Sequence, residues 1–133
     1  MMATEKALHL FLEAEAENIG VARAAVADLA QSHGMEEPTL GDLKTVLSEA
    51  CSNVVRHAYP GTPGTFEVEA VPRDNVLAIV VRDFGTGMRA RANADESSMR
   101  LGLGLISMLS SQFEIAGSSG GGTEIRMQLP LAG

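Results

Sequence analysis

The sequence predicts an α+β fold in which three helices cover one face of a mostly antiparallel sheet. Strand-like runs follow one another with short turns between them, which is the arrangement of hairpins and not of parallel βαβ units. Helix-like runs stand apart from these hairpins, and such segregation is typical of a two-layer sandwich. The 133 residues, 45% of them hydrophobic, suffice for a single domain spanning residues 1–133 with its own core.

The first half of the chain predicts one strand and two helices. Residues 6–13 (KALHLFLE) form a short apolar run typical of a strand, and residues 17–32 place apolar side chains at helical spacing before Gly34. Pro38 favours the start of a second helix, which residues 59–64 (YPGTPG) end. The buried stripe of that second helix is predicted to consist of Leu43, Val46, Leu47, Ala50 and Val54.

The second half of the chain predicts further strands, one helix and one loop. Residues 65–71 alternate apolar and acidic side chains, as a half-buried strand does, and residues 72–75 (PRDN) form the turn that follows. Residues 76–82 are apolar at nearly every position, which predicts a strand covered on both faces. The remaining predicted elements are a polar loop, a helix and two strands, at residues 88–99, 101–112, 113–116 and 123–129.

The composition narrows the class of protein. A formal net charge of -7 opposes a nucleic-acid surface, because phosphate backbones select clustered Lys and Arg. The single cysteine, Cys51, excludes an intrachain disulfide and fits a reducing compartment. The first residues (MMATEKALHL) lack the features of a signal peptide, and no apolar run approaches the roughly 20 residues of a membrane span. We therefore expect a cytoplasmic protein without a membrane segment.

Residues 80–90 (VVRDFGTGMRA) contain two short motifs that are associated with phosphates. Asp83-Phe84-Gly85 matches the metal-binding motif of protein kinases, but the HRD catalytic loop and the strand lysine of that fold are absent from the sequence. Residues 85–90 match the dinucleotide pattern GxGxxA, but a charged polar loop follows where that fold requires an amphipathic helix. Neither motif assigns a fold by itself.

Two further stretches could contribute to phosphoryl transfer. In LKTVLSEACSNVVRHAY, Glu49 and Asn53 are four residues apart and share one helix face. A carboxylate can accept a proton and an amide oxygen can ligate Mg²⁺, although a solvated polar face is the alternative interpretation. In RLGLGL (residues 100–105), glycines at the start of a helix would expose N–H groups to a phosphate, and the alternative is a turn whose glycines serve packing.

Taken in order, these motifs resemble the ATP-site motifs of the GHKL superfamily of ATPases, which includes DNA gyrase and histidine kinases. The matching segments are Glu49-Ala50-Cys51-Ser52-Asn53, Asp83-Phe84-Gly85-Thr86-Gly87, Gly102-Leu103-Gly104-Leu105 and Gly121-Gly122-Thr123. LKTVLSEACSNVVRHAY and VVRDFGTGM most resemble the bacterial anti-sigma-factor serine/threonine kinases. The resemblance covers nearly the whole chain and implies the α/β sandwich of that superfamily, known as the Bergerat fold.

The resemblance implies a role for each matching residue. Glu49 would be the general base, Asn53 would hold the Mg²⁺ that bridges the ATP phosphates, and Asp83 would accept a hydrogen bond from the adenine amino group. Thr123 would support Asp83, and His57 would orient the end of the helix. The other implied ATP-binding residues are Gly85, Gly87, Met88, Arg100, Gly102, Leu103, Gly104 and Leu105.

The resemblance also implies a function in transcription regulation. The protein would be a homodimer that sequesters a sigma factor and phosphorylates a STAS-type anti-anti-sigma protein with ATP and Mg²⁺. Arg23 resembles the arginine with which these kinases contact a partner, and the alternative is a solvated arginine. Residues 88–99, which correspond to the lid of that family, are fewer than usual and include no lysine or threonine. The alternatives are therefore a nucleotide-gated binding module without kinase activity and a detached histidine-kinase-like ATPase domain.

Overall fold

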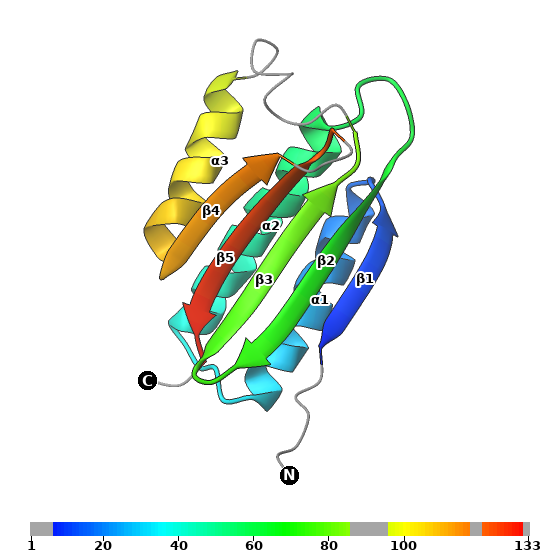
Figure 1. The fold of residues 1–133 in the computed structure, drawn as a ribbon. Coiled ribbons are helices and arrows are strands. Elements are labelled where there is room, and N and C mark those ends of the chain that lie inside the picture. The colour runs from blue at the N-terminus through cyan, green and yellow to red at the C-terminus, as the bar shows by residue number, and fades with distance from the viewer. Residues whose placement is uncertain (1–6, 86–95, 118–120, 132–133) are drawn as a thin grey trace.

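The computed structural model describes residues 7–85, 96–117 and 121–131, which form two layers (Figure 1). One layer is a five-stranded sheet, and the other consists of three helices on one face of it. In chain order the elements are β1 (Leu8–Glu13), α1 (Glu17–Ser32), α2 (Thr39–His57), β2 (Thr65–Arg73), β3 (Val76–Asp83), α3 (Glu96–Leu109), β4 (Gln112–Gly117) and β5 (Thr123–Pro130). The predicted α+β sandwich is therefore confirmed. None of the helices in the described ranges is long and apolar enough to cross a membrane.

Every strand pair in the sheet is antiparallel, and the strand order is β1-β2-β3-β5-β4. The last strand of the chain, β5, is inserted between β3 and β4 (Figure 1). Arg82 near the end of β3 pairs with Glu124 near the start of β5. This topology places Asp83 and Thr123, which are far apart in the sequence, at the same end of the sheet.

The core lies between the sheet and the helices. On the helix side of β3, Leu77, Ile79 and Val81 are at most 1% exposed. Helix α2 crosses the middle of the sheet (Figure 1), and all the residues of its predicted apolar stripe are fully buried. Burial of apolar surface contributes about 25 cal/mol per Å² to the free energy of folding. The buried stripe therefore holds α2 firmly against the sheet, and the polar side chains of α2 are held in place with it.

The prediction that β3 is covered on both faces is wrong. Burial alternates along the strand: the residues facing the helices are buried, whereas Val76, Ala78 and Val80 are only half-buried. The reason is that all the helices lie on one face, so that only neighbouring side chains shield the other face. The turn before β3 is also shorter than predicted, because β2 extends to Arg73 and Asp74 adopts the left-handed conformation of a tight turn (φ 53°).

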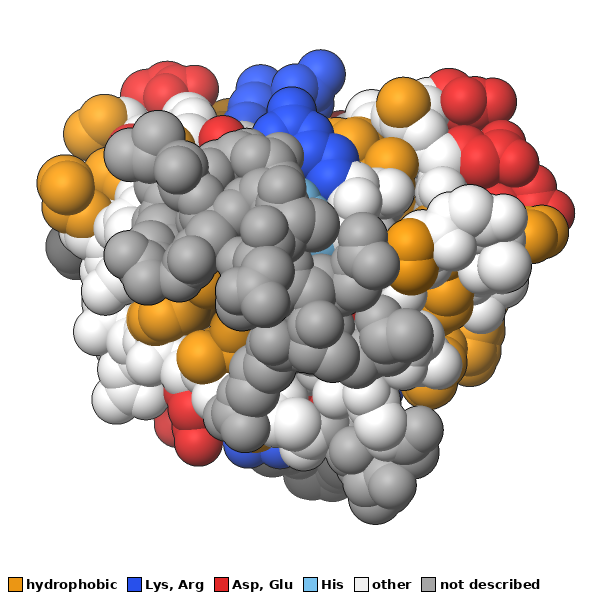
Figure 2. Space-filling model, turned by 90° about the horizontal axis from the view of Figure 1, so that it is seen from above, with side chains coloured by type: hydrophobic (Ala, Val, Ile, Leu, Met, Phe, Trp, Pro, Cys, Tyr) orange, Lys and Arg blue, Asp and Glu red, His pale blue; other side chains and the backbone are white. Residues whose placement is uncertain are grey.

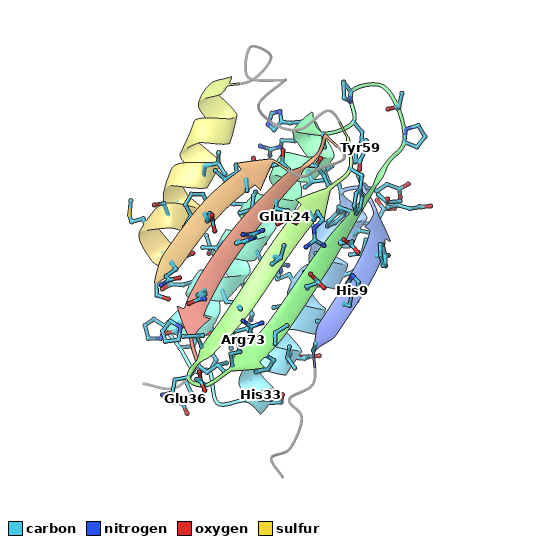
Figure 3. All side chains as sticks on the ribbon, in the orientation of Figure 1. His9, His33, Glu36, Tyr59, Arg73 and Glu124 are labelled. Carbon is cyan, nitrogen blue, oxygen red and sulfur yellow. The ribbon has the colours of Figure 1, made fainter. Side chains whose placement is uncertain are left out.

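The helix-free face of the sheet carries a network of charged side chains. Arg82 donates hydrogen bonds to Glu124, with Nε and Oε2 2.6 Å apart, and also to Glu67. His9 Nε2 lies 2.8 Å from another oxygen of Glu67, and Figure 3 shows His9 and Glu124 on this face. The hydrogen bond from Arg82 is the main cause that lowers the pKa of Glu124. A hollow of about 630 Å³ lies farther along this face, and no predicted site residue lines it.

Candidate functional site

Buried polar side chains gather where β3 ends and β5 begins. Asp83 is the last residue of β3, Thr123 is the first of β5, and Asn53 and His57 lie near the end of α2. All four are at most 4% exposed, and Glu67 is the only other buried polar side chain in the described ranges. Figure 2, which looks onto this end, shows Lys and Arg side chains next to a His side chain, with acidic side chains farther out. Polar groups this well buried require partners, so their contacts indicate what the site can bind.

The carboxylate of Asp83 is fully buried and only partly hydrogen-bonded. Its Oδ1 accepts a hydrogen bond from the N–H of Gly85 at 3.1 Å, and the N–H of Thr123 also donates to the carboxylate. Its Oδ2 has no hydrogen-bond partner within the described part of the chain. Burial raises the pKa of Asp83, and the two N–H donors oppose this effect. A ligand that donates one hydrogen bond to Oδ2 would therefore complete this group.

Glycines let the backbone approach Asp83 closely. A Cβ atom on Gly122 would lie 1.9 Å from the backbone oxygen of Asp83 and 3.0 Å from its Oδ1. A Cβ atom on Gly85 would lie 2.1 Å from the backbone oxygen of Ala58, the first residue after α2. Real Cβ atoms do not approach backbone atoms this closely, so both positions require glycine. The ends of β3, β5 and α2 are thereby joined around one carboxylate.

Glu49 and Asn53 form a second group, where α2 contacts α3. A Cβ atom on Gly102 would lie 2.8 Å from Glu49 Oε2 and 3.6 Å from Asn53 Oδ1. Asn53 is 2% exposed, and its Nδ2 atom has no hydrogen-bond partner in the residues that the structure describes. Glu49 is half-buried. The alternative of a solvated polar face is therefore excluded for Asn53, since this side chain points into the contact between the two helices.

Gly102 and Gly104 lie inside α3 and not at its start. The helix begins at Glu96, five residues before the predicted position 101, and ends at Leu109 rather than at residue 112. Residues 96–99, predicted to belong to the loop, are thus helical. Because only the first four N–H groups of a helix lack a partner within it, those of both glycines bond inside α3. The helix begins with Glu96, Ser97 and Ser98, and acidic and hydroxyl residues of this kind are favoured in a first helical turn. The spacing of apolar residues does not reveal such a turn, so the predicted start came too late.

The other predicted site residues differ in their placement. Leu103 and Leu105 are half-buried on α3, and Leu103 packs against the core. Arg23 is exposed on α1, a helix that carries none of the buried polar groups. Gly87 and Met88 lie outside the described residues, as does the side chain of Arg100, whose backbone belongs to α3.

Tyr59 is a site residue that sequence reasoning missed. Its position in residues 59–64 predicts only the end of α2, yet its hydroxyl accepts a hydrogen bond from the N–H of Phe84 at 2.8 Å. Phe84 follows Asp83 directly, so Tyr59 contacts the chain beside the buried carboxylate. The available signal was that the chain contains one tyrosine, placed directly after the helix that carries Glu49 and Asn53.

The donors and acceptors of this site fit a nucleotide with a magnesium ion. No group of three or more His, Cys, Asp and Glu side chains that could hold a metal occurs among the described residues. Mg²⁺ is nonetheless commonly held by one or two protein oxygens together with substrate phosphates, and the amide oxygen of Asn53 could supply one of them. The open acceptor at Asp83 fits an amino group on a purine ring, which the same nucleotide would carry.

This combination of a buried acceptor, a carboxylate–amide pair on one helix and closely packed glycines agrees with a family of known proteins. Residues 12–129 match the family model described as histidine kinase-like ATPase domain. The match covers most of the 133 residues, so the chain belongs to the histidine kinase-like ATPase domain family.

Two kinds of curated relatives narrow this assignment. The chain is similar to the anti-sigma F factor of Geobacillus thermodenitrificans (strain NG80-2), with 35% identity over 71% of this chain and 63% of that protein. It is also similar to the serine-protein kinases RsbW of Bacillus thuringiensis (strain Al Hakam) and Bacillus cereus (strain AH820), each with 32% identity over 64% of this chain and 53% of theirs. The aligned part thus spans between 53% and 63% of these relatives' lengths. The resemblance to the GHKL superfamily and to anti-sigma-factor kinases is confirmed.

Proposed function

We propose that this protein is an ATP-dependent serine/threonine protein kinase that acts as an anti-sigma factor. The observation that carries the proposal is the fully buried Asp83 carboxylate, whose Oδ2 has no hydrogen-bond partner in the described part of the chain. An unsatisfied buried acceptor costs about 1–3 kcal/mol, and an adenine amino group would satisfy it. The printed names of the relatives, an anti-sigma factor and serine-protein kinases, support the finer assignment.

In the second group of the site, Asn53 on α2 would bind the metal ion at the phosphates, and Glu49 on the same helix would accept the proton of the substrate hydroxyl. Asn53 would contribute an amide oxygen to Mg²⁺, and the bound ion would neutralise charge on the phosphates. Glu49 would accept the proton of the serine or threonine hydroxyl that attacks the terminal phosphate of ATP. Gly102 has no side chain, and the position of Glu49 Oε2 depends on that absence.

The proposed partners are a sigma factor, held while ATP is bound, and a STAS-type anti-anti-sigma protein, which receives the phosphate. Arg23 would contribute to the partner surface, because it is exposed on α1. The proposal includes a homodimer, which sedimentation velocity would test directly. A monomer at micromolar concentration would remove the dimer from the proposal without affecting the nucleotide site.

Phosphotransfer provides the decisive test of the kinase. The protein is incubated with labelled ATP and a panel of STAS domains, and we expect label on at least one of them. Glu49→Gln should abolish transfer while ATP still binds, because the amide cannot accept the proton. Asp42→Asn makes the same chemical change in the first turn of α2 and should leave transfer intact. Folded protein that binds ATP but labels no STAS domain would exclude the kinase assignment.

One observation favours a second candidate, a nucleotide-gated binding module without catalysis. In this structure α3 packs against Glu49 at Gly102, and the N–H groups of Gly102 and Gly104 are used within the helix. Such a protein would bind ATP and ADP and would retain its sigma factor without phosphorylating anything. ATP-dependent capture of a sigma factor by both the wild-type protein and Glu49→Gln, with no label transfer by either, would support this candidate.

A further inference from the structure

Tyr59 connects three parts of the chain at the Asp83 end of the site. Its hydroxyl accepts a hydrogen bond from the N–H of Phe84 at 2.8 Å and donates one to the backbone oxygen of Thr65. Phe84 directly follows β3, and Thr65 is the first residue of β2. Figure 3 shows Tyr59 at this end of the two strands. One phenol therefore joins the segment after α2 to the beginning of β2 and the end of β3.

The ring of Tyr59 lies directly against two glycines. A Cβ atom on Gly64 would lie 2.3 Å from its ring carbons, and one on Gly85 would lie 2.9 Å from its Cε1. The ring thus occupies space that side chains on these two glycines would need. A rigid ring with a hydroxyl that both accepts and donates is a property of tyrosine alone among the side chains, because phenylalanine has the ring without the hydroxyl.

The charge of Asp83 also acts on Tyr59. Burial raises the pKa of the phenol, the hydrogen bond from Phe84 opposes this, and the negative charge of Asp83 raises the pKa further. Asp83 and Tyr59 are therefore coupled through space as well as through the Asp83–Phe84 peptide. A change at either residue should be detectable at the other.

We infer that Tyr59 is a positioning residue of the nucleotide site, which holds the peptide after Asp83 so that Asp83 Oδ2 faces the base. This inference rests on the proposed nucleotide function. Without the hydroxyl, the N–H of Phe84 loses its acceptor, and the segment that carries Asp83 and Gly85 becomes conformationally freer. Binding of the base must then order this segment, which lowers the affinity. The same hydroxyl ties this segment to the end of α2, so the base end is held in place relative to the helix that carries Asn53.

Tyr59→Phe tests the inference, because it keeps the ring and removes only the hydroxyl. We expect adenosine and ADP to bind about fivefold more weakly, the equivalent of one net hydrogen bond. In the Asp83→Asn background the same change should have little further effect, because the group that Tyr59 positions is already altered. Ser111→Ala is the matched control: it removes a hydroxyl that donates to the backbone oxygen of Gln128 at 2.9 Å, near the other end of β5, and should leave affinity unchanged.

Absorbance titration gives a second readout, the electrostatic coupling between Tyr59 and Asp83. Tyr59 is the only tyrosine and the chain has no tryptophan, so phenol ionisation reports on this residue alone. We expect Asp83→Asn to lower the pKa of Tyr59, because it removes the negative charge. Wild-type affinity in Tyr59→Phe, penalties that simply add in the double variant, or an unchanged Tyr59 titration would each overturn the inference. If the wild-type protein binds no nucleotide, the proposed function itself fails. If the wild-type protein binds nucleotide and Tyr59→Phe binds it equally well, only the inference about Tyr59 fails.

Discussion

The two ends of the candidate site differ in how completely the ligand-free chain forms them. At the base end, Asp83 is held by N–H groups of Gly85 and Thr123, and Tyr59 fixes the following peptide. At the phosphate end, Gly102 and Gly104 have their N–H groups bonded inside α3, where they are not available to a phosphate. The base end is thus preorganised, and the phosphate end is not.

This difference has an energetic consequence for ligand binding. A preorganised group pays little ordering cost, so adenosine should bind without changing the position of the Asp83 carboxylate or its hydrogen bonds to Gly85 and Thr123. Phosphates that bond to the N–H groups of Gly102 and Gly104 must first release them from α3. Glycine lowers helix stability by about 0.5–1 kcal/mol relative to alanine, so two glycines make that release less costly. The base end would set affinity, and the phosphate end would couple binding to a change in α3.

Gly122→Ala should produce the largest effect, because it disrupts the preorganised end. The new Cβ would lie 1.9 Å from the backbone oxygen of Asp83, so β3 and β5 must separate locally. We expect a loss of about 1–3 kcal/mol in the free energy of unfolding, the usual range for overpacking, together with loss of adenosine binding. Urea denaturation and calorimetric titration with adenosine measure the two effects.

Gly117→Ala is the control for that substitution. Gly117 ends β4 and pairs with Thr123 across the strands, yet a Cβ atom there meets nothing within 4 Å. It should change neither stability nor adenosine binding appreciably. Equal effects from both variants would show that the glycine content of this region matters, and not the close approach to Asp83.

The same contrast explains how much the sequence could predict. The layers, the buried stripe of α2 and the pairing of Glu49 with Asn53 follow from local spacing, which hydrophobic burial enforces. The start of α3 was missed because residues 96–100 (ESSMR) contribute no apolar stripe.

Contacts between distant segments were beyond local reasoning. The position of Gly122 beside Asp83 depends on β5 being inserted beside β3, a topology that spacing along the chain does not specify. The contacts of Tyr59 depend on where the start of β2 and the end of β3 meet the segment after α2. The charged network depends on two strand registers, that of β3 with β2 for Arg82 and Glu67 and that of β3 with β5 for Arg82 and Glu124. The prediction that β3 is covered on both faces failed for a related reason: an apolar run does not show whether the second face meets a helix or only neighbouring side chains.

Gly104→Ala should produce a smaller effect at the phosphate end. A Cβ atom there meets nothing within 4 Å, so the substitution stabilises α3 by about 0.5–1 kcal/mol. If phosphate binding releases this part of the helix, affinity for ATP should fall by a factor of about 2–5, while affinity for adenosine is unchanged. Thermal unfolding and titration with both ligands provide the measurements.

Gly20→Ala makes the same change in α1, where a Cβ atom also meets nothing within 4 Å. It should stabilise the protein to a similar degree and leave both affinities unchanged. A Gly104→Ala variant that is more stable yet binds ATP as the wild type does would show that the phosphates bind without unwinding α3. The two ends of the site would then be equally preorganised.

The smallest expected effect is a pH-dependent difference in stability between Asp83→Asn and the wild type. Burial raises the pKa of Asp83 above its ordinary value of 3.8, so above the raised pKa the ionised side chain destabilises the folded state. As pH falls, protonation relieves this destabilisation, which is gone below the ordinary value. An asparagine has no charge and can still accept from the N–H groups of Gly85 and Thr123. Urea midpoints should therefore be higher for Asp83→Asn at neutral pH, and the difference should narrow with acidification, although the variant binds adenosine more weakly than the wild type does. A variant less stable than the wild type at neutral pH would instead mean that the ionised carboxylate stabilises the folded protein. Asp83 would then have a structural role, and its burial would not indicate a preorganised ligand site.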